Sequence, residues 1–237
     1  MSRQEHNIES WMDLARLIDK LARQQTTWLF RGEPASTYEL RPAAGREGGD
    51  ERRARTLKYD LEQERIALRR FRHDAQPFVG FRAHSDLEWL AIAQHHGMAT
   101  RLLDWTESIL VAAFFAVEHA GTEGHAKIYG ICGLPLLDPD QDHDPFAVEE
   151  VSVYRPRHLN ARISAQRSVF TIHPDPTAPL DDDRLQQWTV SQSACRELKL
   201  TLDSCAVNYA TMFPDLHGLA RHVGWRYNWG LSQGPLS

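Results

Sequence analysis

The chain has 237 residues and a formal net charge of −5, and 42% of its residues are hydrophobic while 25% are charged. These values are typical of a globular protein with enough apolar material for a sizeable core. The negative net charge gives no overall attraction to nucleic acid or an anionic membrane, so any such binding must be local. No apolar run reaches the roughly 18 residues of a membrane span, and no signal-peptide segment is evident, so we expect no membrane partner.

The chain has 3 cysteines, Cys132, Cys195 and Cys205, and their spacing matches no metal motif. An odd number without metal spacing favours reduced thiols in a cytoplasmic protein that binds no metal. One disulfide with a leftover thiol, or a metal site formed by residues remote in sequence, stays open as an alternative.

The N-terminal part of the chain predicts a helix followed by a strand. Over residues 8–24 apolar residues recur at steps of three and four, and Ser10 can cap this helix. Residues 26–32, TTWLFRG, are rich in β-formers and end at a turn, so they predict a strand. We expect residues 43–50 to form a flexible loop.

A long charged helix is expected over residues 51–73. Five apolar residues can face the core, Leu57, Leu61, Ile66, Leu68 and Phe71, and arginines cover much of the rest. The arginines either form a solvated face with Glu–Arg pairs or contact phosphates. For the second interpretation the candidate nucleic-acid residues are Arg52, Arg53, Arg69 and Arg70.

The middle of the chain predicts two helices around a polar loop. Asp86 can cap a helix over 87–96 that stops at Gly97, and a loop follows at 98–107. The next helix, 107–120, is apolar on every side and should be buried. Its N-terminus would then face the loop and offer N–H groups to an anion such as phosphate.

The second half of the chain changes to strands, expected at 126–133, 151–156, 168–173 and 196–203, with acidic loops at 138–145 and 179–183 and helices over 204–223. Helices first and strands later favour an α+β fold over a doubly wound sheet. With no convincing linker, we expect a single domain.

Several residues could carry chemistry, although the chain has no Walker loop, GxGxxG, GxSxG, HExxH or CxxC motif. Arg31 ends an apolar strand, so its charge needs a partner, which is either an internal carboxylate such as Asp104 or a ligand phosphate or ribose. Arg101 and Asp104 either form an ion pair or leave Asp104 to bind a ligand hydroxyl. Trp105 is either a core residue or a stacking surface. His95 or His96 either ends the helix or faces a ligand.

Five blocks of this sequence resemble the FRG domain. They are Phe30-Arg31-Gly32, the segment 38–46, the block QHHGMATRLLDWTESILVAAFFAVE at 94–118, the segment 161–173, and residues 212–223. The resemblance implies an N-terminal helix at 1–25, an FRG domain over 26–225 and a tail at 226–237. Ser168 departs from the glycine that we expect in this family.

The FRG domain is similar to the ADP-ribosyltransferase fold, so the resemblance implies a split β-sheet with flanking helices that binds NAD. It implies catalytic roles for Arg31, Asp104 and Gln166, the last where a glutamate is common. The implied NAD-binding residues are Arg31, Gly32, His96, Thr100, Arg101, Trp105, Thr106 and Phe170. We expect Arg31, Arg101, Asp104 and Gln166 to converge on one pocket.

The function that the resemblance implies is NAD-dependent mono-ADP-ribosylation in a bacterial toxin or phage-defence setting, with an antitoxin or defence protein as a partner. The basic helix favours nucleic acid, DNA or RNA, as the acceptor. Two alternatives stay open: an NAD glycohydrolase that uses water, and a non-catalytic module that recognises a ligand or partner.

Overall fold

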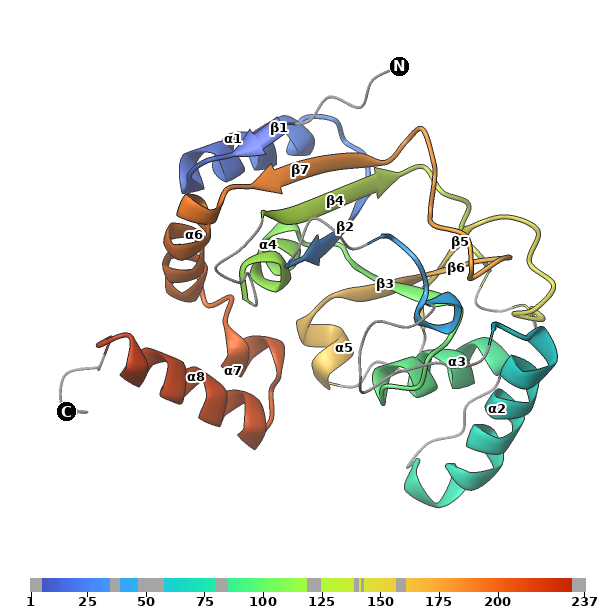
Figure 1. Cartoon of the computed structure of the whole chain (residues 1–237). Coiled ribbons are helices and arrows are strands. Elements are labelled where there is room, and N and C mark those ends of the chain that lie inside the picture. Colours follow the sequence, from blue (N-terminus) through green and yellow to red (C-terminus); the bar gives the residue numbers. More distant parts are fainter. Residues whose placement is uncertain are drawn as a thin grey trace.

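The computed structural model describes residues 6–34, 39–46, 58–79, 85–118, 125–138, 141, 143–156 and 161–231. The strands within them form one seven-stranded sheet in the order β1-β7-β4-β2-β3-β6-β5 (Figure 1). The strands are β1 His6–Ile8, β2 Trp28–Glu33, β3 Leu102–Thr106, β4 Ala126–Cys132, β5 Ser152–Tyr154, β6 Ser168–Ile172 and β7 Gln186–Val190. Only β1 and β7 pair in parallel, and the other neighbours are antiparallel. The architecture is therefore α+β, as the sequence predicts.

The helices gather in three groups around this sheet (Figure 1). Helices α1, α4 and α6 pack on the half formed by β1, β7, β4 and β2, whereas α2, α3 and α5 lie beside β3, β6 and β5. Helices α7 and α8 follow α6 and extend away from the sheet. The helices are α1 Trp11–Ala22, α2 Leu61–Asp74, α3 Asp86–His95, α4 Ile109–Glu118, α5 Ala161–Ala165, α6 Gln192–Ser204, α7 Tyr209–Met212 and α8 Leu216–Asn228.

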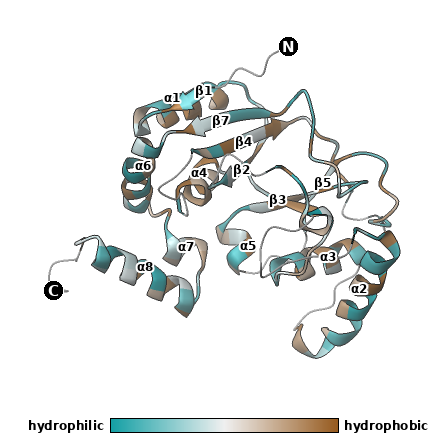
Figure 2. Cartoon of the chain, in the orientation of Figure 1, coloured by the Kyte–Doolittle hydropathy of each residue, from teal (hydrophilic) through white to brown (hydrophobic). Residues whose placement is uncertain are grey.

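Hydrophobic residues collect on both faces of the sheet. Phe30 packs with α4 and α6 on one face, whereas Leu29, next to it in β2, packs with Leu103 and Ile131 on the other. This follows from the alternation of side chains along a strand. Hydrophobic residues line β4, β3 and α4, and hydrophilic ones cover most of α6 (Figure 2).

Helix α4 lies directly on β2, because Gly32 leaves room for it. A Cβ atom at Gly32 would lie 1.8 Å from the backbone oxygen of Ala112 in α4. The helix is buried along Ile109–Glu118 apart from partly exposed Leu110, Phe115 and Glu118, which confirms the prediction from its uniform hydrophobicity.

Several other predictions are confirmed. The side chain of Ser10 accepts a hydrogen bond from the Asp13 amide and caps α1, and Gly97 ends α3 with a φ of +88°. The predicted strands at 126–133, 151–156 and 168–173 correspond to β4, β5 and β6. All three cysteines are free thiols. Apart from these predictions, no helix among the described residues is both long and apolar enough to cross a bilayer.

The predicted strand at 196–203 is wrong, since these residues belong to α6. Leu198, Leu200 and Leu202 alternate with polar residues as they would in a strand, but Ala194, Leu198 and Leu202 also share one buried helix face. Ser191 accepts a hydrogen bond from the Ala194 amide and caps the helix. The strand that lies beside β4 in the sheet is instead β7. Neither β7 nor β1 was predicted from the sequence.

The predicted loop at 98–107 is also wrong over Leu102–Thr106, which form β3 inside the sheet, and α4 begins at Ile109. Because β3 contains polar residues, its sequence did not indicate a strand. Helix α3 begins at Asp86, and its cap is Ser85, which accepts a hydrogen bond from the Glu88 amide.

Helix α2 is shorter than predicted. Asp60 caps it, so Lys58–Asp60 lie outside the helix, and residues 51–57, including Leu57, lie outside the described part. Leu61 and Ile66 are 41% exposed, so their predicted core positions are wrong, whereas Leu68 is buried.

Part of the predicted loop at 43–50 is helical. Residues Ala43–Gly45 form a short 3-10 helix, and residues 47–50 lie outside the described part. Near the ends of the described chain, β1 pairs with β7 and so joins the sheet, and α8 continues to Asn228.

The contact between Gly32 and α4 gives a test of the packing. Gly32→Ala should lower the free energy of unfolding by about 3 kcal/mol or more, because α4 must move away from its position on the sheet. Urea unfolding of the purified protein measures this value. Gly224→Ala is the matched control, since a Cβ atom there meets nothing within 4 Å, and it should be neutral or slightly stabilising. Equal stability of the two variants would contradict the close approach.

Candidate functional site

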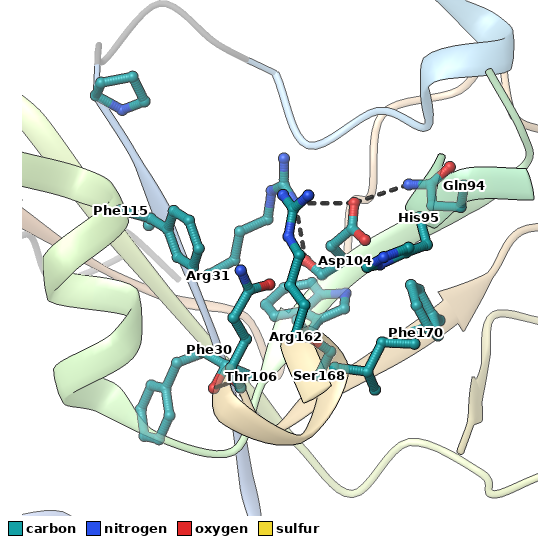
Figure 3. A pocket seen from close by; sticks show the side chains of 15 residues that line it. Phe30, Arg31, Gln94, His95, Asp104, Thr106, Phe115, Arg162, Ser168 and Phe170 are labelled. Carbon is teal, nitrogen blue, oxygen red and sulfur yellow. Dashed lines mark hydrogen bonds and ion pairs between the residues drawn. The ribbon is translucent and has the colours of Figure 1, made fainter. Parts of the chain in front are cut away.

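A cavity of about 330 Å³ lies beside the junction of β2 and β3 (Figure 3). Its volume suits a small ligand or one part of a larger ligand. Seven residues singled out from the sequence line it: Arg31, Gly32, Asp104, Trp105, Thr106, Gln166 and Phe170. Eight further residues complete the lining: Phe30, Pro34, Gln94, His95, Phe115, Arg162, Ile163 and Ser168.

The cavity exists because β2 and β3 separate. Their register contains only the pair Phe30 and Thr106, whereas β2 pairs with β4 along its whole length. Helix α4 covers β2 and α3 covers β3, and the cavity lies on the same sheet face between the two helices. Asp104 lies opposite Phe170 in β6, so these side chains share the face that the cavity occupies.

Arg31 is held by groups of the protein itself. Its Nε donates to Glu33 Oε1 at 2.7 Å, its Nη2 lies 2.6 Å from the same oxygen, and its Nη1 donates to the backbone carbonyl of Asp104 at 2.8 Å. The side chains of Arg31 and Glu33 are only 16% and 9% exposed. Burial acts to lower the pKa of Arg31, but the carboxylates of Glu33 and Asp104 raise it overall. The main partner of Arg31 is therefore an internal carboxylate, Glu33, two residues further along β2.

Asp104 presents its carboxylate to the cavity, with its side chain 53% exposed. Oδ2 accepts a hydrogen bond of 2.7 Å from Nε2 of Gln94 and lies 4.0 Å from Nη1 of Arg31. Gln94 Oε1 in turn accepts a hydrogen bond of 2.7 Å from Thr100 Oγ1. Thr100 is fully buried, so these two hydrogen bonds hold the carboxylate in place; Figure 3 shows the one between Gln94 and Asp104.

Arg162 and His95 stand near Asp104. The Arg162 guanidinium lies 4.5 Å from the ring centre of Phe213 and has no ion-pair or hydrogen-bond partner among the described residues. Burial lowers the pKa of Arg162, against the attraction of Asp104 and Asp215. Burial, Arg162 and His96 together lower the pKa of His95, so this imidazole is neutral at pH 7.

Gln166 and Trp105 are tied into the fold. The side chain of Gln166 donates from Nε2 to the Met212 backbone carbonyl at 3.1 Å. The backbone carbonyl of Gln166 accepts a hydrogen bond from Thr106 Oγ1 at 2.7 Å. Trp105 is buried and donates from Nε1 to Thr171 Oγ1 at 2.9 Å. The core interpretation of Trp105 therefore holds, although the residue also contributes to the cavity wall.

Arg101 lies apart from the cavity, so the prediction of convergence holds for Arg31, Asp104 and Gln166 but is wrong for Arg101. Its side chain is fully buried and pairs with Glu64 of α2 at 2.8 Å. It also donates to Tyr59 and stacks on Phe146 at 4.6 Å. Arg101 joins α2 to the start of β3 and serves the fold.

His96 and Thr100 do not line the cavity either. His96 is exposed at the end of α3, and of the two histidines that could face a ligand it is His95 that lines the cavity. Thr100 contributes indirectly, because its hydroxyl donates a hydrogen bond to Gln94, which in turn holds Asp104. No group of three or more potential metal ligands occurs among the described residues.

The N-terminus of α4, where the sequence predicts an anion site, is partly capped by the chain itself. The Ser108 amide donates to Thr106 Oγ1 at 3.1 Å, and the Val111 amide donates to Ser108 Oγ at 3.5 Å. The carboxylate of Glu107 lies beside them and forms ion pairs with Arg155 and Arg167.

The arginines of α2 form a solvated face. Arg69 pairs with Glu62 at 3.0 Å and Arg70 pairs with Asp74 at 3.6 Å, and all four side chains are exposed. Arg52 and Arg53 lie outside the described residues. A second cavity, also of about 330 Å³, lies between α2 and the 143–146 segment, and its three arginines also pair with carboxylates.

The family model of the FRG domain matches residues 26–124. This part of the chain is similar to the FRG domain. The matched residues include β2, α3, β3 and α4, and so they supply Arg31, Gln94 and Asp104 to the cavity. The similar blocks at 161–173 and 212–223 lie beyond the match and stay predictions. Neither the curated proteins nor the solved structures provide a match to this chain.

Three residues at the cavity or beside it, Glu33, Gln94 and Arg162, had no role predicted from the sequence. Glu33 had a local signal, because residues two apart in a strand point to the same face as each other. Gln94 lies in the quoted block, but its contact with Asp104 requires the packing of α3 on β3. Arg162 had no local signal, since only the tertiary fold brings α5 to the cavity.

The ion pair of Arg31 gives a second test. Arg31→Ala should lower the free energy of unfolding by about 3–5 kcal/mol, because Glu33 would stay buried without a cation. The double variant Arg31→Met, Glu33→Leu should recover most of this loss in urea unfolding. Arg16→Ala is the control, since Arg16 and Asp13 form an exposed pair that contributes about 0–1 kcal/mol. A loss below about 1 kcal/mol for Arg31→Ala would contradict the structural role.

Proposed function

We propose that the chain is an NAD-dependent mono-ADP-ribosyltransferase and that the cavity binds the nicotinamide ribose of NAD. One observation carries this proposal: the Asp104 carboxylate and the Arg162 guanidinium line the same cavity together with the rings of Phe115 and Phe170. The nicotinamide riboside part of NAD is cationic, and the adjoining diphosphate is anionic. Opposite charges in one cavity therefore complement the two parts of this ligand, and aromatic rings suit the flat nicotinamide.

The proposed reaction breaks the bond between the nicotinamide nitrogen and the anomeric carbon of the ribose. The electron pair of this bond goes to nicotinamide, and the ribose carbon passes through an oxocarbenium-like state before the acceptor bonds to it. The Asp104 carboxylate is fixed by Gln94 at 2.7 Å, so it can stabilise this positive charge without reorganising. Catalysis of this kind depends on positioning and electrostatics.

The acceptor must lose a proton as it bonds to the ribose, and an amide such as Gln166 cannot take one. His95 lines the same cavity, and its lowered pKa keeps it neutral and able to accept a proton. We therefore assign the general base to His95 and a supporting role to Gln166.

We also propose a relationship to a known fold and a biological setting for the protein. The separation of β2 and β3 supports a distant likeness to the ADP-ribosyltransferase fold, in which a split sheet binds NAD. Nucleic acid is our proposed acceptor, in a cytoplasmic toxin or phage-defence protein controlled by an antitoxin or defence partner. The ion-paired arginines of α2 supply phosphate contacts only if those exposed pairs open, at a cost of about 0–1 kcal/mol each.

Asp104→Asn tests the proposed chemistry. Nicotinamide released from NAD is measured by chromatography with the protein alone and with DNA, RNA or cell lysate present. The variant should reduce the rate about 10²–10³-fold, with little change in unfolding, because Asp104 is half exposed. Asp74→Asn on α2 is the matched control, since Asp74 is exposed and remote from the cavity.

Three outcomes separate the alternatives. Release that requires an acceptor, with ADP-ribose found on that acceptor, supports the transferase. Equal release in water alone makes the protein an NAD glycohydrolase that uses the same site. No release under any of these conditions contradicts catalysis and leaves a recognition module, in which Arg31 and Glu33 have only their structural role.

A further inference from the structure

We propose that Arg162, and not Arg31, binds the anionic group of the ligand, a phosphate oxygen of a nucleoside diphosphate, and that Phe213 positions Arg162 for this contact. The assignment rests on the proposed function for the identity of the ligand. It differs from the family expectation, which gives the anion to the arginine of the Phe-Arg-Gly tripeptide.

Arg31 has few N–H groups left for a ligand. A guanidinium has five N–H groups on its three nitrogens. In Arg31, Nε and Nη2 lie within 2.7 Å and 2.6 Å of Glu33 Oε1, and Nη1 donates to the Asp104 carbonyl, so two N–H groups remain. The positive charge is neutralised by the buried Glu33. A phosphate at the two remaining N–H groups would lie close to the Glu33 carboxylate and would meet repulsion from it.

Arg162 has the opposite character. It lines the cavity, and none of its N–H groups has a hydrogen-bond or ion-pair partner among the described residues. The nearest acidic groups, Asp104 and Asp215, act on it only through longer-range attraction. Its side chain is exposed and its N–H groups are open to the cavity, so a phosphate can accept charge-assisted hydrogen bonds from them.

Phe213 holds this guanidinium in place. The Phe213 ring lies 4.5 Å from Cζ of Arg162, and stacking on a guanidinium face leaves the N–H groups at its edge free. The ring itself is fixed, because it stacks on Tyr209 at 5.5 Å and meets the edge of Phe115 at 6.3 Å. Phe115 also lines the cavity, so the α7–α8 connection and the cavity wall form one aromatic cluster.

The two charged side chains then orient the ligand. Arg162 projects from α5 and Asp104 from β3, and both point into the cavity (Figure 3). A diphosphate at Arg162 leaves the attached ribose to reach Asp104, and His95 stands next to both. The geometry therefore places the anionic end of the ligand on the α5 side of the cavity.

Calorimetric titration of the full chain with ADP-ribose, inorganic pyrophosphate and nicotinamide tests this assignment. Arg162→Gln should weaken ADP-ribose and pyrophosphate binding about tenfold or more, as expected for loss of one charge-assisted contact. Nicotinamide binding should not change. Arg70→Gln on the exposed face of α2 is the control and should bind all three probes like the unmodified protein.

Phe213 is tested as a positioning residue by a pair of variants. Phe213→Leu should weaken ADP-ribose binding several-fold, and Phe213→Tyr should restore it, because a tyrosine ring stacks on a guanidinium as phenylalanine does. Thermal unfolding checks that both variants fold. Equal affinities in these two variants would overturn the role of Phe213.

The outcomes separate this inference from the proposed function. If the unmodified protein binds neither ADP-ribose nor pyrophosphate, or if Arg162→Gln binds them within about twofold of it, the assignment of Arg162 is overturned. If Arg162→Gln loses pyrophosphate binding while the unmodified protein releases no nicotinamide from NAD, the anion site stands and ADP-ribosyl transfer fails.

Discussion

The separation of β2 from β3 creates the cavity that we propose as the ligand site. The two strands share only the pair Phe30 and Thr106, and α4 presses on Gly32 while α3 covers β3. A continuous ladder would close the space between these helices. Arg31 stabilises the open junction, because its guanidinium donates to the Asp104 carbonyl where β2 has turned away. The cavity is thus a consequence of how the sheet is held together.

The charges near the cavity fall into two groups with different roles. The pairs Arg31–Glu33 and Arg101–Glu64 are buried and satisfied internally, so they hold strands and helices in place. Asp104 and Arg162 line the cavity with part of their surface open and with few internal partners. This division explains why the arginine that names the family domain is a poor candidate for ligand binding here, although it is essential to the shape of the site.

Local signals in the sequence were enough to predict much of the fold. Ser10 and Gly97 mark helix ends through their own backbone chemistry, and the uniform hydrophobicity of α4 predicts its burial. Elements that depend on tertiary context were missed: β3 has polar residues inside the sheet, and Leu198–Leu202 satisfy both helix and strand periodicity. The site shows the same limit. Asp104 could be singled out from its motif. The burial of Arg101 under α2 and the position of Arg162 at the cavity depend on long-range packing.

A crystal structure of the protein with ADP-ribose is the most direct measurement of the central claim, that the open junction of β2 and β3 is the ligand site. The account predicts the diphosphate on Arg162, the terminal ribose beside Asp104, and an unbroken pair between Arg31 and Glu33. A diphosphate bound to Arg31 with Glu33 displaced, or ADP-ribose bound in the cavity beside α2, would contradict it.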